Sequence, residues 1–177
     1  MMNRIYKKIL KKIRSNYIKR IYKIEGKINI FGKVYLDNPN ITFGNNVTLY
    51  QGVQIWGDGQ IDIGDNVAIG KDTIIFSSSI IKIENNVAIA GQCYIIDSDH
   101  GIERSKLINQ QPLIAEPIYI GEDSWVGAGS KILKGSHVSK GSVIGALCII
   151  NGKTEPYSIN VGIPFKKIGE RRDYKYV

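Results

Sequence analysis

The sequence predicts an all-β solenoid, a parallel β-helix of about six triangular coils, because similar segments recur at a fixed spacing. Residues 43–48, 63–68 and 83–88 align with one another at intervals of 20 residues. Within each interval large apolar residues recur every six positions, as at Ile63, Ile69 and Ile75. Three sides of six residues account for 18 of every 20 residues, and the other two fall at a corner. Each side is then a short strand that pairs in parallel with the strand one coil away.

Residues 1–23 are expected to form a basic amphipathic helix before the first coil. They hold apolar residues at helical spacing, with cations between them. Residues 1–24 carry nine basic residues and no acidic one, whereas the rest of the chain carries 15 basic and 16 acidic residues. Two roles are open for this helix. It covers the open end of the prism or a neighbouring subunit, or it makes a peripheral contact with an anionic membrane surface through residues 1–24. The two roles are compatible.

Residues 24–160 are expected to form the β-helix itself. The six-residue period extends back to Ile24 and resumes after residue 117, and each Gly-x-Asn or Gly-x-Asp is expected at a corner because these residues tolerate positive φ. Four positions after most period residues lies a small or branched residue, and both cysteines, Cys93 and Cys148, occupy this position. We therefore expect packed interior thiols rather than a disulfide or a metal site.

The period is interrupted after Asp97-Ser98-Asp99-His100, where the loop 101–117 leaves the coil. Long insertions in compact repeats are commonly functional, and this one leaves directly after a histidine. A neutral imidazole can take a proton from a hydroxyl as that hydroxyl attacks a thioester carbonyl. His100 is thus the candidate catalytic base, with Asp97 or Asp99 as candidates to orient it; the alternative for each aspartate is a solvated corner residue. His137, which has no adjacent carboxylate or loop, is expected at a surface corner.

The 20-residue spacing also indicates which residues lie one coil below His100. Ser77 and Ser78 are expected beneath Asp97 and Ser98, with Asp58 one coil below Ser78 and Trp56 in the column of Ile96. Serine hydroxyls, an aromatic ring and a carboxylate suit the hydroxyl-rich surface of a sugar, so these four residues are candidate substrate contacts. A stacked turn without any ligand explains them equally well.

The interrupted motif carries a family resemblance. Asp97-Ser98-Asp99-His100-Gly101, the loop, and then Pro117-Ile118-Tyr119-Ile120-Gly121-Glu122-Asp123-Ser124-Trp125-Val126-Gly127-Ala128 resemble the hexapeptide-repeat acyltransferases. The likeness is to their galactoside, xenobiotic and surface-polysaccharide O-acetyltransferases, and it spans residues 24–165. It implies a left-handed β-helix, His100 as the base, Trp125 beside the acyl donor acetyl-coenzyme A, and Ala128 and Ala146 along its pantetheine arm. It also implies a homotrimer with active sites between subunits.

Residues 161–177 are expected to form a basic C-terminal tail. Gly162-Ile163-Pro164-Phe165-Lys166 resembles the closing Gly-x-Pro-Ala-Lys segment of the family, with Phe165 in place of alanine. Asn151-Gly152-Lys153 stands where the family often has a threonine-lysine pair. Lys153, Lys166 and Lys167 are therefore the candidates for binding the phosphates of coenzyme A.

Taken with the resemblance, these features predict an acetyl-CoA-dependent O-acetyltransferase that acts on a sugar hydroxyl of a surface polysaccharide or its precursor. Galactoside-type relatives tend to have acidic residues where Ser77 and Ser78 stand, which weakens a galactoside acceptor. One alternative is an acetyltransferase for a small molecule such as an antibiotic, a free sugar or serine; another is a non-catalytic scaffold. No metal is expected, since a three-histidine zinc site needs more than the two histidines present.

Composition sets the remaining expectations. The electrically balanced body argues against nucleic acid as a partner. Without a secretory signal or an apolar run long enough to span a bilayer, the expected location is cytoplasmic, at the inner face of the membrane if residues 1–24 bind lipid.

Overall fold

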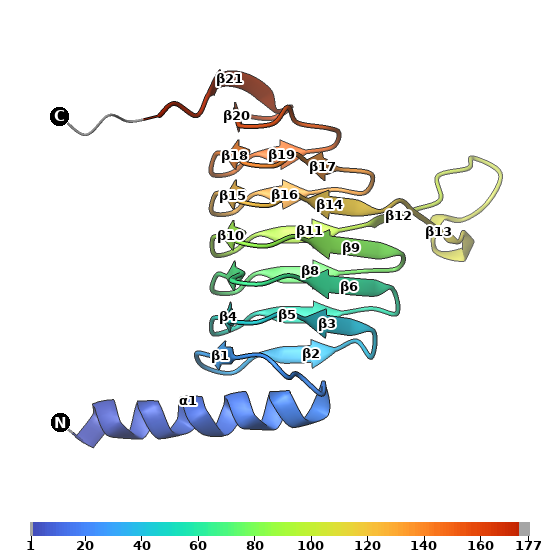
Figure 1. The fold of residues 1–177 in the computed structure, drawn as a ribbon. Coiled ribbons are helices and arrows are strands. Elements are labelled where there is room, and N and C mark those ends of the chain that lie inside the picture. Colours follow the sequence, from blue (N-terminus) through green and yellow to red (C-terminus); the bar gives the residue numbers. More distant parts are fainter. Residues whose placement is uncertain (1, 174–177) are drawn as a thin grey trace.

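The chain folds as a triangular prism of stacked coils with one helix at its N-terminal end (Figure 1). The computed structural model describes residues 2–173. Each coil gives one strand to each of three flat sheets, which we call the first, second and third walls in the order in which the chain visits them. The solenoid has about seven turns. Its sequence period stops at Ile150, and the additional strand of the first wall, β20 (Ser158–Val161), follows that point.

The walls are built from short strands. The first wall contains β1 (Ile28–Ile30), β4 (Val47–Leu49), β7 (Ala68–Ile69), β10 (Ala88–Ile89), β15 (Trp125–Val126), β18 (Val143–Ile144), β20 and β21 (Lys166–Glu170). The second contains β2 (Tyr35–Asp37), β5 (Gln54–Trp56), β8 (Ile74–Phe76), β11 (Tyr94–Ile96), β16 (Lys131–Ile132) and β19 (Ile149–Ile150). The third contains β3 (Ile41–Phe43), β6 (Gln60–Ile63), β9 (Ile80–Ile83), β14 (Ile118–Ile120) and β17 (His137–Val138).

The core is a set of vertical apolar columns inside the prism. Ile55 pairs with Ile75 and Ile75 with Ile95 in parallel register, and each of these side chains has an exposed fraction of 0%. Full burial of one such side chain contributes about 1.5–3 kcal/mol. Cys93 and Cys148 lie in the same interior, both unpaired, as the sequence predicts. Desolvation raises the pKa of both thiols, which keeps them protonated at neutral pH.

The corners between the third and first walls carry a repeated asparagine, which ends the predicted Gly-x-Asn pattern in two coils and follows Glu84-Asn85 in the third. Asn46, Asn66 and Asn86 have φ of 60°, 57° and 61°, in the left-handed region that asparagine tolerates better than most residues. Their side chains form a ladder, since the amide of Asn46 donates to Asn66 at 3.0 Å and that of Asn66 to Asn86 at 3.1 Å. The sequence repeat therefore reflects repeated backbone geometry and repeated side-chain hydrogen bonds.

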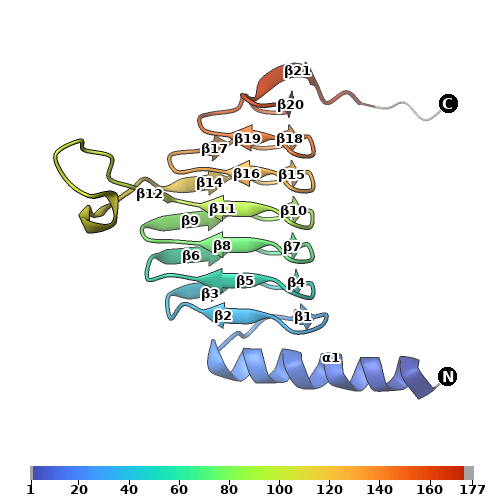
Figure 2. The ribbon, with the colours of Figure 1, turned by 180° about the vertical axis from the view of Figure 1, so that it is seen from behind.

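Helix α1 (Met2–Ile21) lies across the open N-terminal end of the prism (Figure 2). Ile18 is buried against the first coil, and the Ser15 hydroxyl accepts a hydrogen bond of 3.1 Å from the backbone N–H of Ile30. The helix ends where Lys23 turns to a φ of 50°, a left-handed termination common at helix ends. Among the described residues, no helix combines the length and apolarity needed to cross a membrane.

The segment expected as a basic tail begins with an ordered strand. β21 runs antiparallel to β20 at the C-terminal end of the first wall. The Arg171 side chain donates to the carboxylate of Asp123 at 2.7 Å, which fastens the segment to the coil below. Residues 174–177 of the expected tail lie outside the described residues.

Candidate active site at the root of the arm

An arm of residues 101–117 projects from the edge between the second and third walls (Figure 1). It follows β12 (Ser98–His100), which pairs antiparallel with β13 (Leu113–Ala115) of the arm, and it contains the short 3-10 helix η1 (Ile108–Gln110). The neck of the arm is closed by a hydrogen bond of 2.9 Å from the backbone N–H of Glu116 to the carbonyl of Asp97. The chain therefore leaves the coil and returns to it at nearly the same point.

Gln111 holds the interior of the arm together. Its side chain accepts from the N–H of Glu103 at 2.7 Å and donates to the carbonyls of Glu103 and Lys106 at 3.0 Å each. The residue is 8% exposed, so water cannot readily replace these bonds. The arm is thus a folded unit with its own polar centre.

We expect Gln111→Ala to loosen the arm while leaving the prism intact. Losing three hydrogen bonds of a buried amide costs about 1–3 kcal/mol of local stability, so trypsin cleavage after Arg104 and Lys106 should accelerate by about tenfold. The measurement is limited proteolysis followed by mass spectrometry. Gln110→Ala is the matched control, because the neighbouring Gln110 is exposed and its side chain makes no hydrogen bond in the described structure. Equal cleavage rates in the two variants would contradict this role for Gln111.

His100 lies at the end of β12, opposite Leu113, where the arm meets the coil. Its side chain is exposed, and the described residues offer its imidazole no hydrogen-bond partner. Both ring nitrogens are therefore open to a ligand or to a neighbouring chain. Neither Asp97 nor Asp99, the residues predicted to orient this histidine, forms a hydrogen bond with it within residues 2–173.

Asp97 instead fastens the edge to the coil below. It is 0% exposed. One carboxylate oxygen accepts from the Ser77 hydroxyl at 2.7 Å and the Ser79 N–H at 2.9 Å, and the other accepts from the Ser78 N–H at 2.7 Å. Three donors to one buried carboxylate form a structural clamp beneath His100.

Asp99 belongs to a charged cluster that the motif analysis missed. Lys134, one coil above, lies 3.0 Å from a carboxylate oxygen of Glu116 and 3.8 Å from one of Asp99. The hydrogen bond with Glu116 raises the pKa of Lys134. The pairing of Ile95 with Ile132 places residue 134 over Asp97, so the column reading used for Ser77 could have found this lysine.

The four predicted substrate contacts lie along the same edge as His100. Trp56 packs against Phe76 in a tilted arrangement, with ring centroids 4.3 Å apart, and remains 45% exposed. Ser78 and Asp58 are exposed, whereas Ser77 is buried and its hydroxyl donates a hydrogen bond to Asp97. A polar and aromatic strip therefore runs down the edge from His100 towards the helix.

The predicted donor-binding residues lie elsewhere on the prism. Trp125 is on the first wall and 54% exposed, and Ala128 and Ala146 are exposed at successive corners between the first and second walls, where Leu147 donates to the carbonyl of Ala128. In one chain these residues and His100 occupy different edges.

The candidate phosphate-binding lysines are also divided. Lys166 and Lys167 lie on β21 above the first wall. Lys167 forms ion pairs with Glu155 and Glu170, which raise its pKa, whereas Lys166 is exposed and has no ion pair within residues 2–173.

Lys153 pairs with His137 of the third wall through an isolated parallel backbone β-bridge, whereas the other two lysines lie on β21. His137 itself is exposed, but it lies on strand β17 beside Tyr119 and not at a corner as expected. The six-residue period continues through His137, so this residue falls within a strand of the third wall and not at a corner between two walls.

Comparisons with known proteins agree with this architecture. Protein-family models gave no match, and neither did a search of curated proteins. Among solved structures, a point mutant of AntD, an N-acyltransferase from Bacillus cereus, in complex with dTDP-4-amino-4,6-dideoxyglucose and coenzyme A, matches with a TM-score of 0.78 at 20% identity over 90% of each chain. A maltose O-acetyltransferase from Clostridium difficile 630 matches with a TM-score of 0.59 at 23% identity, over 96% of this chain and 87% of that one.

The acetyltransferase domain of PglB from Neisseria gonorrhoeae FA1090, in complex with acetyl coenzyme A, matches with a TM-score of 0.62 at 15% identity. That match covers 80% of this chain and 57% of the other. At these identities the likeness establishes the fold: the chain has the hexapeptide-repeat, left-handed β-helix fold of these acyltransferases.

Proposed function

We propose that this protein is a coenzyme A-dependent acyltransferase that transfers acetyl to a sugar hydroxyl of a surface polysaccharide or its precursor, with His100 as the base. The observation that carries the proposal is the position of His100. It is an exposed imidazole without an internal partner, at the root of a folded arm, beside a strip of hydroxyl, carboxylate and aromatic side chains. Purely structural residues of the repeat require none of these features.

In this reaction an imidazole nitrogen of His100 takes the proton of the acceptor hydroxyl. The hydroxyl oxygen attacks the thioester carbonyl, a C–O bond forms, and the C–S bond of acetyl-coenzyme A breaks. The imidazolium returns its proton to the departing sulfur, so the products are an acetyl ester and free coenzyme A. A positioned base of this kind accelerates a reaction by about 10²–10⁴-fold. Asp97 acts in this proposal by holding the backbone below His100, and Asp99 through its ion pair with Lys134.

The donor would bind across a neighbouring chain, and a homotrimer with sites between subunits is the assembly we propose. Two observations support it. Trp125, Ala128 and Ala146 lie on a different edge from His100, and the arm exposes a set of large apolar residues: Ile102, Leu107, Ile108, Leu113 and Ile114. Covering these side chains against a neighbour removes apolar surface from water. Lys166 is then the better candidate for a coenzyme A phosphate, because Lys167 is already paired with two carboxylates.

A second candidate acceptor is the amino group of a sugar carried on a nucleotide. The specific observation behind it is the match to the AntD complex with dTDP-4-amino-4,6-dideoxyglucose, whose TM-score exceeds that of the maltose O-acetyltransferase. The same base and donor arrangement serves an amine, with an amide as the product in place of an ester.

The test is incubation of the purified protein with acetyl-coenzyme A and a panel of acceptors: surface glycans, free sugars, small alcohols and amino-sugar nucleotides. Mass spectrometry identifies each product, and hydroxylamine distinguishes a labile ester from a stable amide. We expect esters on glycans. Amides found only on amino-sugar nucleotides would establish the second candidate, and esters only on small molecules would contradict the polysaccharide assignment. Absence of coenzyme A release with every acceptor would favour a scaffold.

A further inference from the structure

Helix α1 presents a continuous apolar stripe to solvent. Tyr6, Ile9, Ile13, Tyr17 and Ile21 recur every three or four residues and are between 51% and 65% exposed. At about 100° per residue, this spacing puts all five on one face of the helix. A row of five large exposed side chains differs from the scattered apolar residues of an ordinary surface and indicates a binding face.

The opposite face of the helix is already used by the protein. Ser15 and Ile18 are buried against the first coil, and Tyr22 donates a hydrogen bond of 3.2 Å to the carbonyl of Leu36. The exposed stripe therefore lies on the side of the helix that faces away from the prism. The helix itself lies at the N-terminal end of the molecule (Figures 1 and 2). The helix does not need the stripe in order to cap the coils.

The helix also carries exposed cations. Arg20 lies beside the stripe, whereas Lys8 and Lys12 lie on the side of the helix that lines a second cavity with the first coil. Residues 1–24 contain nine basic residues and no acidic one, although the rest of the chain is close to neutral. This charge complements a surface of anionic phosphates. It also opposes the pairing of two copies through this face, which would bring two such cationic segments together.

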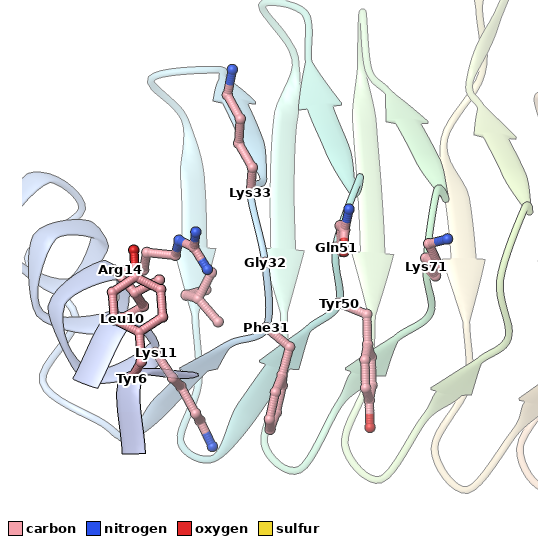
Figure 3. Close-up of a pocket in the computed structure, with 11 residues that line it drawn as sticks. Tyr6, Leu10, Lys11, Arg14, Phe31, Gly32, Lys33, Tyr50, Gln51 and Lys71 are labelled. Atoms are coloured by element: carbon pink, nitrogen blue, oxygen red, sulfur yellow. The ribbon is translucent and has the colours of Figure 1, made fainter. Parts of the chain in front are cut away.

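A cavity of about 630 Å³ lies between the helix and the coils, and its lining also combines aromatic rings with cations. Tyr6 lines it at the border of the stripe, together with four cations, Lys11, Arg14, Lys33 and Lys71, and no acidic residue (Figure 3). Arg14 reaches across the cavity towards the coils, while the stacked rings of Phe31 and Tyr50 form its wall. Aromatic rings and long cationic side chains are the groups that suit the headgroup region of a bilayer.

We propose that the outer face of α1 docks the N-terminal end of the prism on the surface of a bilayer that contains anionic lipid. The apolar stripe enters the boundary between headgroups and acyl chains. Lys12, Arg20 and the two helix cations of the cavity, Lys11 and Arg14, are then closest to the lipid phosphates, whereas Lys33 and Lys71 lie farther away on the coils. This inference goes beyond the proposed acyl transfer and does not depend on it.

The experiment is co-sedimentation of the full-length protein with vesicles. At low salt we expect binding to phosphatidylcholine vesicles with about 30% phosphatidylserine to exceed binding to pure phosphatidylcholine by at least tenfold, since each cation near the surface contributes about a fivefold factor. Raising the salt to about 0.5 M should weaken the binding, because screening shortens the reach of the charges. Absence of binding at low salt would overturn the proposal.

Variants identify the docking face. Ile9→Gln with Ile13→Gln should lower vesicle affinity at least tenfold, and Lys12→Gln with Arg20→Gln should lower it by a factor of about five for each residue and flatten the salt dependence. The matched control is Ile163→Gln with Ile168→Gln, two exposed apolar residues beyond the other end of the prism, which should bind like the wild type.

Circular dichroism verifies the helix in each variant, and the charge variant provides a second test if the stripe variant does not fold. Binding that survives both helix variants would contradict the assignment. So would a stripe variant that changes only the oligomeric mass in light scattering, since the face would then pair two copies.

Discussion

His100→Ala is expected to lower the rate of acetyl transfer by at least about two orders of magnitude, the typical contribution of a positioned general base. The substitution removes the only imidazole on β12 and β13, at the root of the arm. Because the side chain is exposed and makes no internal hydrogen bond within residues 2–173, its loss should leave the fold unchanged. Initial rates with acetyl-coenzyme A and an acceptor found in the panel provide the measurement.

His137→Ala is the matched control, since His137 is the other histidine, is also exposed and lies on the third wall. It should retain nearly full activity. Circular dichroism and the oligomeric mass should be the same for both variants. Turnover by His100→Ala within a factor of a few of the wild type would refute the assignment of the base, even if acyl transfer itself had been demonstrated.

Asp97→Ala is expected to destabilise the fold by about 3 kcal/mol or more. The carboxylate accepts three hydrogen bonds in a site with no exposure to water, and its removal leaves the Ser77 hydroxyl and the N–H groups of Ser78 and Ser79 unpaired. Hydrogen bonds to a charged group contribute about 1.5–3 kcal/mol each, and buried donors without partners are costly. Urea unfolding monitored by circular dichroism measures the free energy of unfolding.

Asp99→Ala is the control for that measurement. Its carboxylate is 58% exposed and lies 3.8 Å from Lys134, an arrangement that contributes less than about 1 kcal/mol. If Asp97→Ala does not fold, Asp97→Asn supplies an intermediate case, because an amide oxygen can still accept from one or two of the three donors. Equal unfolding free energies for the Asp97 and Asp99 variants would show that the three hydrogen bonds of Asp97 stabilise the fold no more than the exposed ion pair of Asp99 does.

The scaffold could be predicted from the sequence because residues that stack on one another in successive coils recur at a fixed spacing along the chain. Ile55, Ile75 and Ile95 recur at the spacing at which they stack, and Asn46, Asn66 and Asn86 recur where the corners need positive φ. Handedness was available only from the family resemblance, since spacing alone does not contain it. The number of turns differed by one because the last strand of the first wall follows a segment that no longer keeps the six-residue period.

The candidate site could be predicted only in part, because neighbours in sequence and neighbours in space differ at a corner. Asp97 is three residues from His100, yet its side chain turns inward to Ser77, one coil below. Lys134 is far from His100 in sequence, yet it reaches Asp99 from one coil above. Columns of the solenoid predict such contacts better than linear motifs do. That Trp125 and His100 lie on different edges could be seen only from the arrangement of the three walls in the structure.

The closed neck of the arm has a consequence for how such a protein can change. The Glu116 N–H and the Asp97 carbonyl join the two ends of the insertion, and the pairing of Ile81 with Ile118 resumes the coil in the register it had before. The coils before and after the 17-residue insertion therefore keep the register that they would have around an ordinary corner. Arms of other lengths or sequences can be exchanged at this point without a shift in the coils. The arm can thus be replaced as a unit, independently of the scaffold that supports it.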